Sequence, residues 1–144
     1  TVTDTGTKLS TSATQSMAVA VDASKKGTVK APLVLTGAAS GDKILISDAT
    51  SFRPIPITSA DVAAAGAAVN STKLSDWVNA ALSAKGANLD QHQIGWFELN
   101  GSTFLVEQSH MAGSPYGSGD SLVQLTGVAL DETNALLSNH VLTL

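Results

Sequence analysis

Apolar residues along this chain gather mostly in short runs that have the length and alternation of β-strands. These runs are bounded by glycine, asparagine, serine and proline, which is typical of strands joined by short turns. The runs that predict strands cover residues 28–36, 42–47, 94–99, 103–106, 121–126 and 140–144. A further run, residues 52–58, alternates proline with isoleucine. Proline cannot donate a backbone hydrogen bond, so we place this run at a sheet edge.

One stretch, residues 71–85, has the spacing of a helix instead. Its apolar residues fall on one helical face: Leu74, Trp77, Val78, Ala81 and Leu82. Such a stripe can pack against a sheet. Gly86 follows the stretch and suits the position just after a helix C-terminus. We expect Trp77 to lie in the core, with Trp96 packed beneath it.

Three shorter segments complete the pattern. Residues 59–69 are rich in alanine, which favours a helix, but they include Gly66 and lack large apolar residues, so helix and loop both stay open. Residues 130–137 predict one helical turn. The pair Asn100 and Gly101 separates two strand-like runs, and this pair predicts a hairpin with a type I′ turn.

The order of these elements predicts an α+β fold that is mostly β. We expect an antiparallel sheet or a β-sandwich with the single helix packed on it, formed by one domain of residues 28–144. Residues 1–27, here named the N-terminal arm, begin with a polar stretch rich in threonine and serine. We expect this arm to be extended, because its first half has too few large apolar residues to form a core of its own.

The composition excludes several classes of protein. Of the 144 residues only 14% are charged, and the net charge is −4. The cations are scattered, whereas a protein surface that binds nucleic acid or an anionic membrane needs clustered cations. The chain has no cysteine, which excludes disulfides and thiolate chemistry. Its apolar runs are much shorter than the roughly 20 residues that cross a membrane as a helix.

The sequence Ser-Gly-Asp precedes an apolar run twice, at residues 40–42 and 118–120. One interpretation is a plain turn, because glycine permits it and aspartate accepts hydrogen bonds from nearby backbone amides. The other is calcium binding, because carboxylates and turn carbonyls are the hard oxygen ligands that Ca²⁺ prefers. On the second interpretation Asp42 and Asp120 are the candidate metal ligands, and calcium supports folding or assembly modestly.

No motif in the chain points to catalysis. His92, His110 and His140 lack the spacing of metal ligands, and the chain has no Gly-x-Ser-x-Gly elbow for a nucleophilic serine. Glu98 and Glu107 flank the predicted hairpin. A glycosidase cleft also needs aromatic walls, however, and aromatic residues make up only 4% of the chain. We therefore expect that the protein is not an enzyme.

The C-terminal part of the chain resembles a known module. Residues 94–144, which include "IGWFELNGSTFLVEQS" and "GSGDSLVQLTGVALDETNALLSNHVLTL", resemble a C-terminal β-rich module of repeat-in-toxin-like and S-layer-like bacterial surface proteins. The segments "LTGAASGDKILIS" and "LSDWVNAALSAKG" are similar to those that precede the module, so the resemblance covers residues 35–144. It implies a secreted or cell-surface location and export by the type I secretion machinery through an uncleaved C-terminal signal, here residues 140–144.

These features lead to two hypotheses of different classes. The first is a structural protein that assembles with copies of itself into a bacterial surface layer or filament, since low charge reduces repulsion and open sheet edges invite strand pairing. Residues 1–21 would then donate a strand to a neighbouring subunit, with Met17, Val19 and Val21 on the inserted face. The alternative is an arm folded back on its own domain. The second hypothesis is an adhesin-type module that binds a glycan or matrix ligand through residues 108–119.

Overall fold

The computed structural model describes residues 2–4, 10–12, 19–20, 28–29, 32–39, 41–46, 48–117, 119–130 and 135–144. The predictions for Met17 and Val21 lie outside the described residues, as do residues 131–134 of the predicted helical turn. The described strands are β1 (Val2–Asp4), β2 (Ser10–Ser12), β3 (Val19–Ala20), β4 (Thr28–Val29), β5 (Leu33–Thr36), β6 (Lys43–Ile46), β7 (Ser51–Phe52), β8 (Gln93–Leu99), β9 (Ser102–Gln108), β10 (Ser121–Thr126), β11 (Leu136–Ser138) and β12 (Val141–Thr143). The described helices are α1 (Ser59–Ala64) and α2 (Leu74–Leu82).

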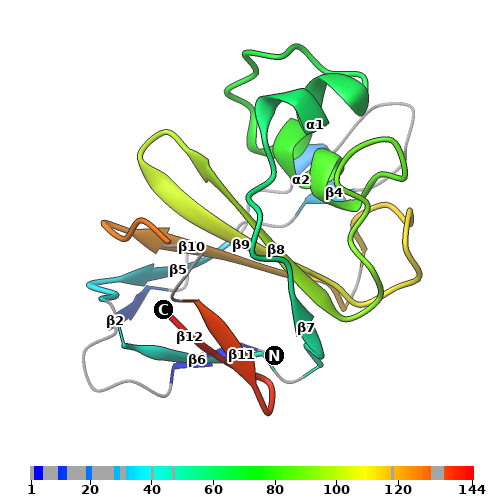
Figure 1. Ribbon diagram of the computed structural model, residues 1–144. Coiled ribbons are helices and arrows are strands. Elements are labelled where there is room, and N and C mark those ends of the chain that lie inside the picture. Colours follow the sequence, from blue (N-terminus) through cyan, green and yellow to red (C-terminus); the bar gives the residue numbers. More distant parts are fainter. Residues whose placement is uncertain are drawn as a thin grey trace.

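Two sheets pack face to face (Figure 1). One has the strand order β2-β5-β10-β9-β8-β7, the other has the order β1-β6-β12-β11, and β3 and β4 form a separate pair. Neighbouring strands are antiparallel except for β5 with β10 and β7 with β8, which are parallel. The predicted α+β class, mostly β, is confirmed.

The core between the two sheets is mainly aliphatic. Alternate side chains of each strand point to the same face of a sheet, so each strand contributes one row of side chains to this core. The fully buried side chains of this layer are Leu35, Ile44, Ile46, Ile94, Leu105, Val123, Leu125 and Leu142. Burying each one contributes about 1.5–3 kcal/mol, which makes this layer a main source of stability.

The helix α2 covers the other face of the six-stranded sheet (Figure 1). Phe97 of β8 is fully buried there, and its ring stacks with Trp77 at 5.4 Å and with Phe104 at 5.3 Å between centroids. Trp96 faces the opposite layer, where its Nε1 donates a hydrogen bond to the carbonyl of Pro54 at 2.9 Å. The prediction that Trp96 packs beneath Trp77 is therefore wrong, because consecutive residues of β8 face different layers.

The helix predicted over residues 71–85 is shorter at both ends. Before α2, the hydroxyl of Ser71 donates to the carboxylate of Asp76 and accepts the N–H of Lys73 at 3.2 Å, which forms a turn instead of a first helical turn. After Leu82 the backbone of Ser83 is extended, with ψ at 137°. Neither described helix is long and apolar enough to cross a membrane.

Three further segments decide open or mistaken predictions. The alanine-rich stretch begins with α1, a second helix, where the carboxylate of Asp61 accepts the N–H of Thr58 at 2.8 Å. The helical turn predicted within residues 130–137 is wrong where β11 forms. The predicted hairpin between β8 and β9 is confirmed, since Asn100 and Gly101 have φ of 51° and 77°, as a type I′ turn requires.

The described strands at the start of the N-terminal arm pair with the chain's own sheets. β1 is antiparallel to β6 and β2 is antiparallel to β5, and each is the outermost strand of its sheet. In this chain the arm thus adopts the folded-back arrangement at these two strands, and it forms one edge of each sheet.

Candidate functional site

The aspartates of the two Ser-Gly-Asp stretches make the same local hydrogen bonds. In each, the aspartate N–H donates to the carbonyl of the residue three positions earlier, and the aspartate carboxylate accepts the N–H of that same residue. The partner of Asp42 is Ala39, at 3.0 and 2.9 Å, and the partner of Asp120 is Gly117, at 3.3 and 2.8 Å. The glycine before each aspartate has a positive φ, 90° and 106°, which is costly for other residues. The turn interpretation therefore accounts for the repeat.

Asp120 makes further contacts beyond those that close its turn. Its Oδ1 accepts hydrogen bonds from the backbone N–H of Ser109 at 2.7 Å and from the Ser109 hydroxyl at 2.8 Å, and it lies 3.1 Å from His110 Nδ1. The Asp120 side chain is fully buried. One carboxylate thus joins Ser109, which directly follows β9, to Gly117, which lies four residues before β10. We name residues 109–117 the β9–β10 loop.

The two candidate calcium ligands lie in separate turns. Asp42 precedes β6 in the four-stranded sheet, whereas Asp120 precedes β10 in the six-stranded sheet. Within the described part of the chain, no group of three or more histidine, aspartate or glutamate side chains is arranged to hold a metal ion. Calcium binding by these aspartates stays a prediction, and at Asp120 it would have to displace the amide N–H groups that the carboxylate now accepts.

Glu107 is a second buried carboxylate at the base of the β9–β10 loop. Its side chain is 1% exposed, and its Oε1 lies 3.4 Å from Nδ1 of His92. Burial raises the pKa of Glu107, the hydrogen bond with His92 partly offsets this, and the negative charge of Asp120 raises the pKa further. His92 is positioned by the sheet, since its N–H donates to the carbonyl of Gln108 at 2.5 Å. The neutral form of Glu107 is therefore favoured more than that of an exposed glutamate.

Ser109, His110 and Asp120 touch one another, but not in the order of a catalytic triad. In a triad, serine and aspartate contact different nitrogens of the imidazole ring. Here Ser109 Oγ and Asp120 Oδ1 both lie 3.1 Å from Nδ1 of His110, and the serine hydroxyl donates directly to Asp120. This geometry closes the loop and does not activate the serine as a nucleophile.

Tyr116 gives a direct probe of this site, because it is the only tyrosine of the chain. Its hydroxyl lies 3.4 Å from the carbonyl of Asp120, and its side chain is 5% exposed. Burial raises the pKa of Tyr116 to about 12, with smaller contributions from the charges of Asp120 and Glu107.

We predict that a spectrophotometric titration of the folded protein gives a phenolate midpoint near 12. The unfolded protein in urea should titrate near the ordinary value of about 10. Because the folded-state pKa is the higher one, the neutral ring stabilises the fold below the unfolded pKa, and this stabilisation is lost as the pH rises from about 10 to about 12. Equal midpoints in the two states would contradict the burial of Tyr116.

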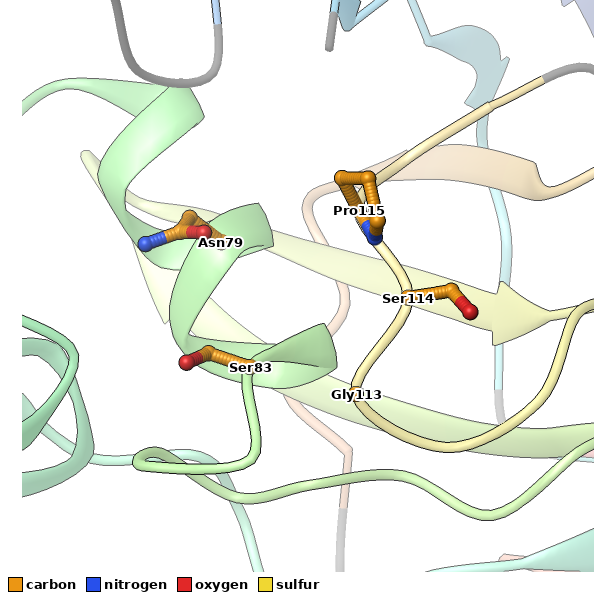
Figure 2. A pocket seen from close by; sticks show the side chains of 5 residues that line it. All are labelled: Asn79, Ser83, Gly113, Ser114 and Pro115. Carbon is orange, nitrogen blue, oxygen red and sulfur yellow. The ribbon is translucent and has the colours of Figure 1, made fainter. Parts of the chain in front are cut away.

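A pocket of about 270 Å³ lies between α2 and the β9–β10 loop (Figure 2). Its lining residues are Asn79 and Ser83 on the helix side and Gly113, Ser114 and Pro115 on the loop side. Gln108 is buried and supports the loop wall, since its Nε2 donates to the carbonyls of Met111 and Ser114 at 3.4 and 3.2 Å. The lining has no charged side chain, so the pocket suits a small neutral polar group.

The sequence located this loop but not all the residues that hold it. The prediction that residues 108–119 form a loop that binds a ligand is wrong at Gln108, which ends β9. The predictions from sequence did not include that Gln108 and Ser109 hold the loop in place. A usable signal was the run of three polar residues Glu107 to Ser109, whose first two residues end β9. The rest of this strand consists of apolar residues, serine and threonine. Buried polar side chains at a strand end need partners, and a following loop is the nearest source.

No known protein family matches the chain, and no curated protein is detectably similar to it. The resemblance of residues 35–144 to the C-terminal module of bacterial surface proteins therefore stays a prediction. Function has to be argued from the chain's own sheets, loop and charges.

Proposed function

We propose that this protein is a structural subunit that assembles with copies of itself into a bacterial surface layer or filament, without enzymatic activity. The observation that carries the proposal is the placement of the N-terminal arm. Its strands β1 and β2 each supply the outermost strand of a different sheet. An edge strand near a chain terminus makes the same main-chain hydrogen bonds whether its own subunit or a neighbour supplies it.

The strands beneath the arm need a partner. Without β1, the edge of its sheet would be β6, with the apolar residues Ile44, Leu45 and Ile46. Without β2, the edge of the larger sheet would be β5, with Leu33, Val34 and Leu35. Exposed apolar edge strands are templates for pairing with another chain, so exchange of the arm would link subunits.

The opposite edge of the larger sheet is protected from such pairing. There the outermost strand, β7, has only two residues, and Pro54 and Pro56 follow it closely. Short edge strands and proline both block strand addition. Linkage through the arm therefore has a direction, from the arm of one copy to β5 and β6 of the next, which generates a chain of subunits rather than random aggregates.

Deletion of residues 1–21 tests this proposal. We predict that the truncated protein keeps the α2 layer and the central strands but no longer forms ordered polymers, as judged by light scattering and electron microscopy. A synthetic peptide of residues 1–21, added in excess, should bind the truncated protein and leave it monomeric. A peptide with the same composition in scrambled order is the control. Normal polymers formed by the truncated protein would contradict arm exchange.

The proposed export route gains one structural constraint. Residues 140–144, the proposed type I secretion signal, include β12, which lies between β6 and β11 in its sheet. Leu142 of this strand is fully buried. Deleting the tail would therefore remove a central strand as well as a signal. Export is better tested by fusing residues 94–144 to a carrier protein and measuring its secretion.

A binding module is the second candidate, and the pocket beside the β9–β10 loop favours it. Asn79 lines this pocket from α2, and Ser114 lines it from the loop (Figure 2). Neutral polar groups of this kind can hydrogen-bond a glycan hydroxyl. Binding of the monomer to a glycan array, lost on Ser114→Trp, would favour this candidate over a structural subunit.

A further inference from the structure

Gln108 carries a fully buried amide whose two polar atoms are used unequally. Its Nε2 donates hydrogen bonds to the carbonyls of Met111 and Ser114, at 3.4 and 3.2 Å. Its Oε1 has no hydrogen-bond partner in the part of the chain that the structure describes. Buried polar atoms are nearly always paired, because a buried acceptor without a donor is unfavourable. The β9–β10 loop therefore accounts for the nitrogen of this amide but not for its oxygen.

The amide cannot turn over to pair its oxygen with the loop. The nitrogen of a side-chain amide is a donor and its oxygen is an acceptor. Exchanging the two atoms would set Oε1 of Gln108 against the carbonyl oxygens of Met111 and Ser114, and two acceptors repel each other. The loop thus fixes the orientation of the amide, and a donor from a bound molecule is what Oε1 requires.

Gln108 lies next to the pocket between α2 and the β9–β10 loop. Alternate residues of a strand share one face of the sheet, and Phe104 and Val106 of β9 pack in the layer that α2 covers. Gln108 continues this row at the end of the strand. It also bonds the backbone of Ser114, a residue that lines the pocket. The amide and the pocket therefore share one face of the sheet and one wall residue.

We propose that this pocket binds one neutral sugar ring and that a hydroxyl of the sugar donates a hydrogen bond to Oε1 of Gln108. The lining has no charged side chain, so an anion or a cation gains no ion pair there. Hydroxyls both donate and accept, which suits a wall with amide and hydroxyl side chains, and Pro115 offers an apolar surface to the C–H groups of the ring.

The size of the pocket limits the ligand. Its volume of about 270 Å³ lies just below the roughly 300–1,000 Å³ of most small-molecule sites, which favours one ring over a longer glycan chain. The inference rests on the second candidate function, the binding module, and does not depend on exchange of the N-terminal arm. It adds the class of ligand and the residue that recognises it.

Titration of the full chain, followed by nuclear magnetic resonance, tests the site. The probes are the methyl glycosides of glucose, galactose, mannose and N-acetylglucosamine, with an anionic sugar, N-acetylneuraminic acid, and a cationic one, glucosamine, as controls. At least one neutral glycoside should shift the side-chain amide signals of Gln108 and the N–H signal of Gly113 saturably, with a dissociation constant on the order of 1–10 mM for a ligand of this size. Its deoxy analogue without the donating hydroxyl should bind about three- to tenfold more weakly, the usual net effect of one hydrogen bond.

Two variants separate recognition from support of the loop. Gln108→Met removes the acceptor, so the glycoside and its deoxy analogue should bind this variant equally, whereas a role in loop support alone would leave their difference unchanged. Gln124→Met is the matched control on β10, where the amide donates to the hydroxyl of Ser102 at 3.0 Å, and it should keep the full difference.

The proposal is overturned if no neutral glycoside shifts Gln108 at about ten times the expected constant, or if both charged controls bind as well as the neutral sugars. It is also overturned if every deoxy analogue binds the wild-type protein as tightly as its parent. Sugar binding that shifts only residues far from Gln108 would overturn this site and leave the binding-module candidate standing. If Gln108→Met does not fold, the wild-type titrations with the deoxy analogues decide.

Discussion

Substitution of Asp120 by alanine is expected to lower the free energy of unfolding by about 3 kcal/mol, whereas Asp42→Ala should cost only about 1 kcal/mol. The two aspartates close the same turn, so the turn itself is common to both variants. Asp120→Ala also leaves the N–H and the hydroxyl of Ser109, both part-buried, without their acceptor. A buried donor left unpaired costs about 1–3 kcal/mol, and two part-buried donors near the lower end of that range make Asp120 the more costly loss.

Denaturant unfolding of the two variants side by side measures this difference. Asp42→Ala is a matched control, because it removes one carboxylate from the same kind of turn at the start of a strand. Asp120→Asn is the second variant, since it keeps the shape and one acceptor but loses the charge. It should fall between wild type and Asp120→Ala. Equal losses for Asp42→Ala and Asp120→Ala would mean that the contacts with Ser109 contribute nothing to stability.

Local features of this fold were predictable because short-range chemistry decides them. The Asn100-Gly101 turn needs only its own two residues to adopt positive φ, and Asp42 and Asp120 each bond with the residue three positions earlier. The second role of Asp120 was not predictable in this way. It depends on Ser109, which is eleven positions earlier and which the pairing of β9 with β10 brings to the carboxylate.

The wrong prediction of the layer in which Trp96 packs has a different cause. Alternation assigns residues to a buried and an exposed face only when one face meets water. All seven residues of β9 are buried, and β8 is buried at five of its seven positions, because a second sheet covers one face and α2 covers the other. The sequence of these strands therefore could not tell which face Trp96 takes. The β11–β12 turn was missed because it uses Asn139 and His140 at positive φ instead of asparagine and glycine.

The prediction that Gly86 directly follows the helix is wrong, but the position requires glycine for another physical reason. It was expected to follow directly on the helix as a C-terminal cap, a position that favours glycine because of its left-handed backbone. The helix α2 instead ends at Leu82. The chain after it folds back on the helix, with the N–H of Ala87 donating to the carbonyl of Ala80 at 2.8 Å. Glycine is required there by close packing of two backbone segments.

Gly86→Ala is therefore expected to lower the free energy of unfolding by about 3 kcal/mol, at the upper end of overpacking costs. A Cβ at this position would lie 2.2 Å from the carbonyl oxygen of Ala80, a backbone atom that cannot move without disturbing α2. Relief of the clash would break the Ala87 hydrogen bond and shift the fully buried Leu89 that follows it.

The control is Gly66→Ala, whose Cβ would meet nothing within 4 Å although φ is +96°. It carries only the cost of a left-handed residue, about 1–2 kcal/mol. Thermal and denaturant unfolding of both variants compare a steric cost with a conformational one. A Gly86→Ala protein as stable as wild type would show that the segment after α2 can move away from the helix. In that case the pocket wall formed by α2 would be adaptable rather than fixed.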